Sequence, residues 1–242
     1  FDRAAPATIR TNVLVTGLQS GENLVGIDMR PADGMLYGVG STGRLYTLDP
    51  TTGAATNKSR LAADAADTTD AFTALAGTNF GVDFNPMADR LRIVSNTGQS
   101  LRINVDTGAT TTDGVINRAG AAPSVAAAAY TNSILNATTT QLFDVDSTSS
   151  VLALQNPPND GTLVNVGPLG MTIAGDAGMD IGGGANGLAL AALRTSATGP
   201  SSLYRIDLTT GAATPINGAT TPATSVIGTG TPGLRDIAIW LR

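Results

Sequence analysis

A short apolar segment with a central aspartate occurs four times in this chain of 242 residues. The four copies are Val25-Gly26-Ile27-Asp28-Met29, Gly81-Val82-Asp83-Phe84, Gly178-Met179-Asp180-Ile181 and Arg235-Asp236-Ile237-Ala238. Successive aspartates are separated by 55, 97 and 56 residues. A period of about 50 residues is typical of a solenoid or a propeller, in which each repeat is one supersecondary unit. The double step predicts a degenerate copy at Val125–Ala129, with Ala127 in place of the aspartate.

Each copy is followed by further β-prone segments that are separated by turns. In the first unit these segments are 35–40, 44–48 and 54–56, and the last one follows the turn Asp49-Pro50-Thr51-Thr52-Gly53. The proline presets φ in such a turn, and the glycine allows a positive φ. The third unit differs, since Pro157 and Pro158 exclude a central strand and predict a longer hairpin loop there. The pattern predicts four-stranded antiparallel meanders.

Four-stranded units of this length are propeller blades. We therefore expect one all-β domain over residues 1–242, and its blades are expected at about 24–59, 80–115, 122–170 and 176–217. The end of the chain, Leu234–Leu241, resembles an innermost strand, and Thr8–Leu18 resembles an outer one. A closing blade made of 231–242 plus 1–18, without its second strand and most of its third, completes the prediction. The predicted fold is a five-bladed β-propeller whose ring is closed by the N- and C-terminal strands.

The innermost segments are rich in glycine and alanine, which suits close packing near the axis of a propeller. Residues 57–79 are expected to form an excursion between blades, with room for a helical turn.

The sequence resembles an uncharacterised family of exported bacterial β-propeller domains. The motifs that carry the resemblance are GIDMRP at Gly26–Pro31, LYGVGSTGRLY at Leu36–Tyr46, GVDFNP at Gly81–Pro86 and QNPPNDGTL at Gln155–Leu163. Members of that family usually extend further at the amino end, which would supply the strands that the closing blade lacks. The resemblance implies a propeller fold and export from the cell, and it implies no activity.

Composition excludes several classes of function. The chain has no histidine and no cysteine, so it contains no Ser-His-Asp triad, no His-ligated metal site and no thiol nucleophile. We therefore predict a protein that is not an enzyme, with no catalytic residue and no cofactor, although calcium stays an alternative. The net charge is −5 and the 14 basic residues are scattered, so a nucleic-acid partner is not expected.

The sequence also bears on where the protein acts. No segment approaches the roughly 18 apolar residues that a membrane span needs. The chain has a single Lys and a single Glu against 13 Arg and 18 Asp, a bias that fits an exported bacterial protein. The start at Phe1 fits removal of a signal peptide, and it fits a fragment equally well. We expect a secreted or cell-surface location.

The four repeated aspartates are the candidate metal ligands: Asp28, Asp83, Asp180 and Asp236. If their carboxylates point toward the axis, a hard cation such as calcium would suit them. The alternative is structural, with each carboxylate accepting hydrogen bonds from backbone amides of its own or the next blade. One aspartate per blade favours the structural role.

Other motifs give weaker signals. Gly182–Gly187 matches G-x-G-x-x-G, but a strand follows it instead of a helix, so a turn is predicted. Asp144–Ser147 lacks the glycine and the glutamate of a calcium loop. The carboxylates of Asp64, Asp67 and Asp70 are expected to be solvated. Aromatic side chains that could stack on a sugar or peptide, although their strand positions favour packing, are Tyr37, Tyr46, Tyr130, Tyr204 and Trp240.

We predict a non-catalytic exported propeller that acts as an interaction or assembly module. The open strand edge of the closing blade is the expected contact, either with a partner protein or with another copy of the chain. Two alternatives remain: a carbohydrate- or peptide-binding module, and a calcium-dependent lactonase-like hydrolase. The hydrolase would need Glu22, the only glutamate, among its ligands.

Overall fold

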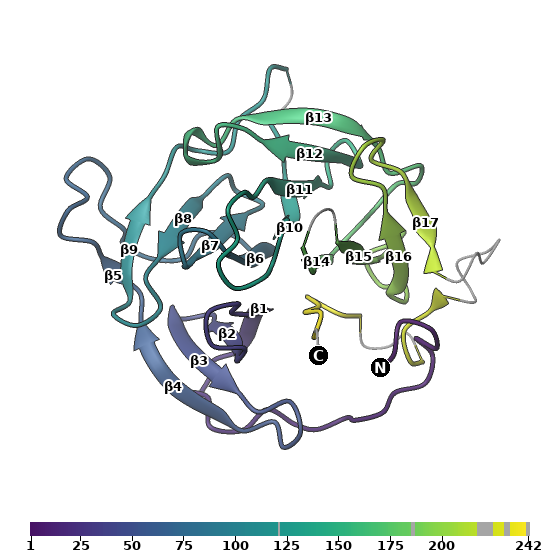
Figure 1. The fold of residues 1–242 in the computed structure, drawn as a ribbon, viewed down its shortest axis with the longest axis horizontal. Helices are drawn as coiled ribbons and strands as arrows, with labels where there is room; N and C mark the ends of the chain where they lie inside the picture. Colours follow the sequence, from purple (N-terminus) through teal and green to yellow (C-terminus); the bar gives the residue numbers. More distant parts are fainter. Residues whose placement is uncertain (121, 185–186, 217–224, 230–232, 241–242) are drawn as a thin grey trace.

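The computed structural model describes residues 1–120, 122–184, 187–216, 225–229 and 233–240. Within these ranges the strands form four sheets that surround a common axis as the blades of a β-propeller (Figure 1). Each blade is an antiparallel meander whose first strand lies next to the axis. No helix in the described ranges is long and apolar enough to cross a membrane.

The blades follow one another in chain order. Blade 1 consists of β1 (Leu24–Met29), β2 (Leu36–Gly40), β3 (Arg44–Leu48) and β4 (Ala55–Arg60). Blade 2 consists of β6 (Phe80–Asn85), β7 (Arg90–Ser95), β8 (Ser100–Ile103), β9 (Ala109–Thr112) and the added β5 (Ala62–Ala63). Blade 3 consists of β10 (Val125–Tyr130), β11 (Leu142–Asp146), β12 (Val151–Gln155) and β13 (Leu163–Pro168). Blade 4 consists of β14 (Gly178–Gly182), β15 (Leu188–Leu193), β16 (Ser202–Ile206) and β17 (Ala213–Pro215).

The predicted meanders are confirmed in all four blades. The loop at Pro157 and Pro158 is also confirmed, since it connects β12 to β13 and contains the short 3-10 helix Pro158–Asp160. The predicted helical turn in residues 57–79 is wrong. Instead, Ala62 and Ala63 form β5, which pairs in parallel with β9 and extends blade 2 outward.

The predicted fifth blade is wrong: the propeller has four blades. Neither the described residues of 1–18 nor those of 231–242 form a strand, and residues 231, 232, 241 and 242 lie outside the described ranges. Residues 1–18 make only isolated bridges, such as the one between Thr16 and Ala54. A strand needs a neighbour to complete its hydrogen-bond ladder, and no strand of the described chain forms such a ladder with either segment.

Two segments nevertheless span the space between blade 4 and blade 1, which we call the seam. The inner segment, residues 233–240, lies near the axis, and the outer segment, residues 6–16, runs along the rim (Figure 1). The inner segment replaces a contact between β14 and β1: its Asp236 lies against Gly178 of β14 and bonds to Ile27 of β1. The ring is thus closed by side-chain contacts instead of a sheet.

The core lies between the blades. Aliphatic side chains of blade 1 and blade 2 form one cluster, which includes Val39, Leu45 and Ile93. A second cluster joins blades 3 and 4, and a third joins blades 2 and 3. A fourth cluster packs Leu234, Ile237 and Ile239 of the inner segment onto blade 4. Burial of this apolar surface fixes the angle between neighbouring blades and anchors the inner segment.

Close packing at the axis explains the small residues of the innermost strands. A Cβ atom added to Gly81 would lie 2.4 Å from the backbone nitrogen of Ala128 in the next blade. A Cβ atom on Gly178 would lie 2.4 Å from Cα of Asp236. Backbone atoms cannot move aside as a flexible side chain can, so these two positions require glycine for close approach.

Strand register corrects the assignment of the degenerate copy. In blade 1 a bulge lies between Leu24 and Gly26, and Asp28 pairs with Tyr37. Blade 3 has the same bulge between Val125 and Ala127, and Ala129 stands where Asp28 stands. The prediction of Ala127 is therefore off by two residues, because the blades differ in length and the spacing in sequence alone does not fix which residues pair.

Candidate functional site

The structure brings three of the four predicted metal ligands together. One carboxylate oxygen each from Asp28, Asp83 and Asp180 lies within 4.8 Å of the other two. All three residues are buried, with at most 3% of their surface exposed. Asp236 lies outside this triplet, in the inner segment. The innermost strands point these side chains toward each other because they occupy the same place in three blades around one axis.

Each carboxylate also accepts a hydrogen bond from the backbone of the next unit around the ring. Asp28 Oδ2 accepts from the amide of Phe84 at 2.7 Å, and Asp83 Oδ1 accepts from that of Tyr130 at 3.0 Å. Asp180 Oδ2 accepts from the amide of Ile239 in the inner segment. These bonds link blade 1 to blade 2, blade 2 to blade 3, and blade 4 to the inner segment.

Asp236 completes the ring of links. Its Oδ2 accepts from the amide of Ile27 in blade 1 at 2.9 Å, and its Oδ1 accepts from the amide of Ile237. Blade 3 has Ala129 at the aspartate position and contributes no such link, so its contact with blade 4 rests on apolar packing and on backbone contacts such as the bridge between Ser133 and Gly182.

Burial controls the ionisation of these carboxylates. It raises the pKa of Asp28 well above the ordinary value, and repulsion from Asp180 adds to the effect. Burial and repulsion from Asp28 likewise raise the pKa of Asp83. Burial raises the pKa of Asp180 to about 6 and that of Asp236 well above its usual range. Desolvation disfavours the charged form of a carboxyl group, and a like charge nearby disfavours it further.

The repulsion between the three buried carboxylates can be relieved in two ways. Calcium takes oxygen ligands at 2.3–2.6 Å, so oxygens on one ion lie at most about 5 Å apart, and the triplet meets this limit. Alternatively, shared protons relieve the repulsion while the backbone bonds stay in place. The cation site stays a prediction, whereas the links between blades are present in the structure.

Glu22 does not join this cluster. Its carboxylate accepts hydrogen bonds from the amide and hydroxyl of Thr42 and from the hydroxyl of Tyr46, all in blade 1. Burial opposes ionisation of Glu22, but these bonds lower its pKa overall. A ligand set of the lactonase type would need Glu22 beside the aspartates, and the structure separates them.

A second buried acid, Asp144 of the motif Asp144–Ser147, lies in blade 3. Asp144 on β11 is fully buried, and within the described residues neither of its carboxylate oxygens has a hydrogen-bond partner. Burial raises its pKa to about 8, although the charge of Arg92 opposes the shift. The neighbouring Asp146 differs, since it binds Arg118 at 2.6 Å and accepts from the amides of Ser124 and Thr148.

Arg92 is part of a buried polar network between blades 2 and 3. Its guanidinium pairs with Asp113 at 2.5 Å and donates to Asn159 at 2.9 Å and to Tyr130 at 3.2 Å. Sequence reasoning missed this network. Alternation along β7 places Arg92 on the same face as the exposed Arg90, so the local sequence carries no signal that Arg92 is buried.

Most of the other candidate residues from the sequence analysis are buried or bonded in ways that indicate a structural role. The four tyrosines Tyr37, Tyr46, Tyr130 and Tyr204 are buried, whereas Trp240 is exposed. Asp64 and Asp67 accept hydrogen bonds within their own turns, and Asp67 also binds the amide of Thr112. The motif Gly182–Gly187 includes Ala185 and Asn186, which lie outside the described residues.

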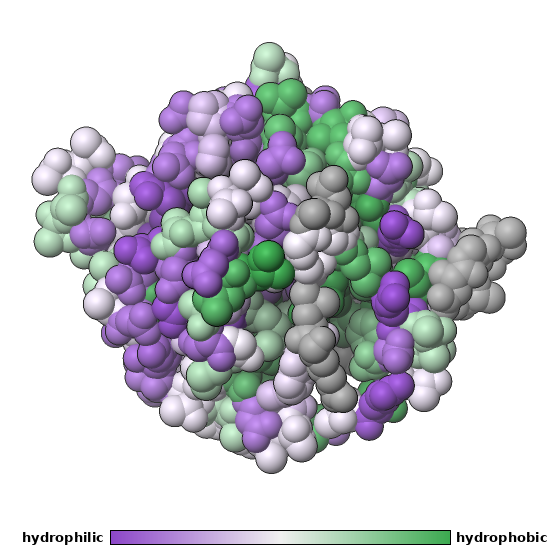
Figure 2. Space-filling model, in the orientation of Figure 1, coloured by the Kyte–Doolittle hydropathy of each residue, from purple (hydrophilic) through white to green (hydrophobic). Residues whose placement is uncertain are grey.

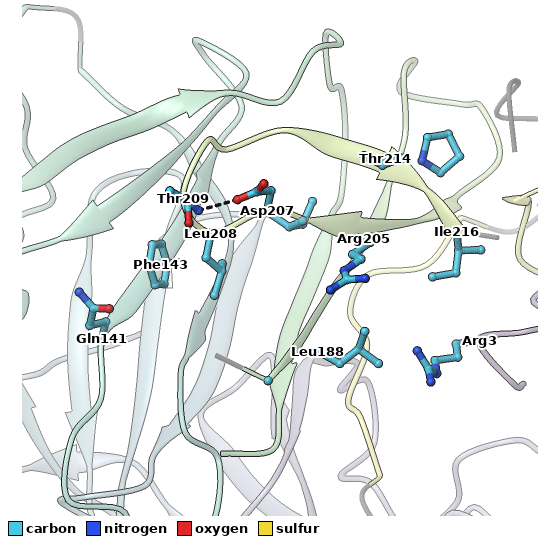
Figure 3. Close-up of a pocket in the computed structure, with 13 residues that line it drawn as sticks. Arg3, Gln141, Phe143, Leu188, Arg205, Asp207, Leu208, Thr209, Thr214 and Ile216 are labelled. Carbon is cyan, nitrogen blue, oxygen red and sulfur yellow. Dashed lines mark hydrogen bonds between the residues drawn. The ribbon is translucent and has the colours of Figure 1, made fainter. Parts of the chain in front are cut away.

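A groove of about 890 Å³ lies at the edge of blade 4 and was not predicted (Figure 3). Phe143 and Gln141 line it from blade 3, and Arg205, Asp207 and Thr209 line it from the β16–β17 hairpin. Arg3 of the N-terminal segment forms its far side (Figure 3).

The fold and the ring of aspartates define the protein as a four-bladed β-propeller. The chain belongs to the family described as a domain of unknown function, DUF4394, whose sequence profile matches residues 1–228. A search of curated proteins found no match.

Among solved structures, the chain is similar to a Bacteroides uniformis protein provisionally named a 6-phosphogluconolactonase. The two share 17% sequence identity with a TM-score of 0.40, over 86% of this chain and 59% of the other. The chain therefore spans little more than half of that protein, and a likeness this distant carries nothing about activity.

Proposed function

We propose that this propeller is a non-catalytic interaction module that associates with a second copy of itself through the outer segment of the seam. The observation that carries the proposal is a row of exposed apolar side chains on a segment with no strand beside it. Ile9, Val13 and Val15 are each more than two fifths exposed, and Leu14 is 87% exposed. Such a row is costly in water unless something covers it.

The backbone of the segment is held at both ends and open between them. Pro6 O accepts from the amide of Gly228 at 3.0 Å, and Thr16 exchanges hydrogen bonds with Gly53 and Ala55 of blade 1. Within the described chain, residues 9–15 form no backbone hydrogen bond. Unpaired amides and carbonyls on an extended segment can pair with a strand of another molecule.

The sequence of the segment suits self-pairing. Residues 9–15, Ile-Arg-Thr-Asn-Val-Leu-Val, contain mostly β-formers, no proline and one charge. Antiparallel pairing centred on Asn12 places Ile9 opposite Val15 and Thr11 opposite Val13. It sets no like charges opposite each other, and a symmetric pair of this kind is self-complementary. Export from a bacterial cell belongs to the same proposal and rests on composition alone.

Sedimentation velocity of the wild type and two matched variants tests the proposal. We expect a concentration-dependent dimer for the wild type and for Val164→Asp, which adds a charge to exposed β13 far from the seam. Val13→Asp places buried carboxylates at the dimer contact, so it should be monomeric. A wild type that stays monomeric at all concentrations, or a Val13→Asp dimer as stable as that of the wild type, would overturn the proposal.

A further inference from the structure

The groove at the edge of blade 4 carries two arginines although the protein is acidic overall. Neither Arg3 nor Arg205 takes part in an ion pair among the residues that the structure describes. Both residues are exposed, whereas the buried arginines Arg30, Arg92 and Arg194 form ion pairs. The two guanidinium groups of the groove therefore leave their donors available to an anionic ligand.

The positions of the two arginines are set by different parts of the fold. Arg205 pairs with Thr214 across the β16–β17 ladder, so both side chains stand on the same face of blade 4. Arg3 comes from the N-terminal segment. Figure 3 shows both guanidinium groups on the same side of the groove, around Leu188 and Ile216.

The other polar side chains of the lining are uncharged, with one exception, and the rest of the lining is mostly apolar. Gln141, Thr209 and Thr214 supply side-chain amide and hydroxyl groups that can donate and accept hydrogen bonds. The exception is Asp207, whose carboxylate turns to the amides of Thr209 and Thr210 at 2.8 and 3.2 Å. Those bonds lower its pKa, so the group is ionised and committed to its own turn.

We infer that this groove binds an acidic saccharide, with carboxylates on the arginines and hydroxyls on the neutral polar groups. A ligand with many hydroxyls matches amide and threonine side chains that both donate and accept. The apolar faces of sugar rings match Leu188 and Ile216. A groove of about 890 Å³ is large enough for several sugar rings, in the upper part of the range of ligand sites. The inference does not rest on the proposed self-association.

Isothermal titration calorimetry at low ionic strength tests the inference with three probes. These are tri-galacturonic acid, the neutral trisaccharide maltotriose and citrate, which has carboxylates without a sugar ring. We expect binding of tri-galacturonic acid, weakened at least tenfold in Arg205→Gln and in Arg3→Gln. The matched control is Arg60→Gln, which removes the same charge from an exposed position of blade 1 and should bind like the wild type.

Each other outcome overturns the inference. Citrate binding as strong as that of the trisaccharide would make the groove a plain anion site. Equal binding of maltotriose would remove the role of the arginines. No heat from any probe, or equal losses in Arg60→Gln and Arg205→Gln, would exclude a saccharide site here. Because Val13→Asp leaves the groove intact, a failure of self-association is seen separately.

Discussion

Asp236 Oδ2 accepts a hydrogen bond of 2.9 Å from the amide of Ile27, a residue 209 positions earlier in the chain. This bond joins the last described segment to the first strand and closes the ring without a sheet. It repeats a link that Asp28 and Asp83 make between consecutive blades. The repeated aspartate therefore links neighbouring units through a hydrogen bond to the backbone, and its fourth copy, Asp236, closes the ring.

Removal of the closing carboxylate should destabilise the fold. Asp236→Ala leaves the amides of Ile27 and Ile237 without their acceptor in a partly buried site. A buried unsatisfied donor costs about 1–3 kcal/mol, so for two partly buried donors the free energy of unfolding in urea should fall by roughly 1–4 kcal/mol. Asp207→Ala also removes two amide bonds, but in an exposed turn, and should cost about 1 kcal/mol or less. Equal losses of unfolding free energy in Asp236→Ala and Asp207→Ala would contradict the role of Asp236 as a link between units.

The buried Asp144 should make stability depend on pH. Its pKa in the fold is about 8, whereas the unfolded chain has the ordinary value near 4. The folded state thus binds more protons than the unfolded state between these values. The contribution of Asp144 to the free energy of unfolding is therefore fully present below about pH 4 and is lost as pH rises to about 8. A pKa difference of about 4 between the folded and unfolded states corresponds to a loss of unfolding free energy on the order of 5 kcal/mol.

Asp144→Asn tests this dependence, because the amide keeps the size and cannot ionise. Urea unfolding from pH 4 to pH 8 should show a shallower fall in stability for the variant than for the wild type. Asp49→Asn, in an exposed turn of blade 1, is the control: hydrogen bonds from Thr51 and Thr52 lower the pKa of Asp49, so it titrates below this range and should leave the slope unchanged. Identical slopes for Asp144→Asn and the wild type would show that Asp144 is ionised in the fold.

Calcium should not change the stability of the protein if the role of Asp28, Asp83 and Asp180 is to link blades. Asp83→Asn keeps an acceptor for the amide of Tyr130 and removes a charge repelled by Asp28 and Asp180. We expect a higher melting temperature for the variant at pH 8 and no difference near pH 4, where the carboxyls are protonated. In the wild type, calcium should not shift the melting temperature. A rise with calcium that Asp83→Asn abolishes would establish a cation site instead.

The approach of neighbouring blades should not tolerate a methyl group at Gly81. A Cβ there meets backbone atoms of Ala127 and Ala128, so Gly81→Ala forces β6 and β10 apart. Overpacking of this kind costs about 1–3 kcal/mol in a urea titration. Gly34→Ala is a useful contrast, because its positive φ brings strain but no atom lies within 4 Å. The blade contact would be looser than described if Gly81→Ala were fully stable.

The strands of the four blades could be predicted because each carries its own alternation and its own turn residues. Asp49 and Gly53 mark one such turn, and the hydrogen bond between their backbones confirms it. These signals are local, so they can be recognised in the sequence without knowledge of the rest of the fold.

The closure could not be predicted in the same way. The residues around Asp236 resemble an innermost strand, but a strand also needs a neighbour, and whether one exists depends on the whole ring. Side chains from three units meet at the axis, so Asp28, Asp83 and Asp180 could be proposed as neighbours from their repeat alone. Asp144 and Arg92 could not, since their surroundings come from two blades with no common motif.

Self-association through the outer segment is most directly tested by a cysteine at its predicted centre. The natural chain has no cysteine, so Asn12→Cys provides a single thiol. In an antiparallel pair centred on this residue the two Cα atoms lie about 4.5–5.5 Å apart, which suits a disulfide. Under mild oxidation we expect Asn12→Cys to form a covalent dimer much faster than Leu135→Cys, whose thiol is exposed on another loop. A monomeric Asn12→Cys that oxidises no faster than Leu135→Cys would contradict the account.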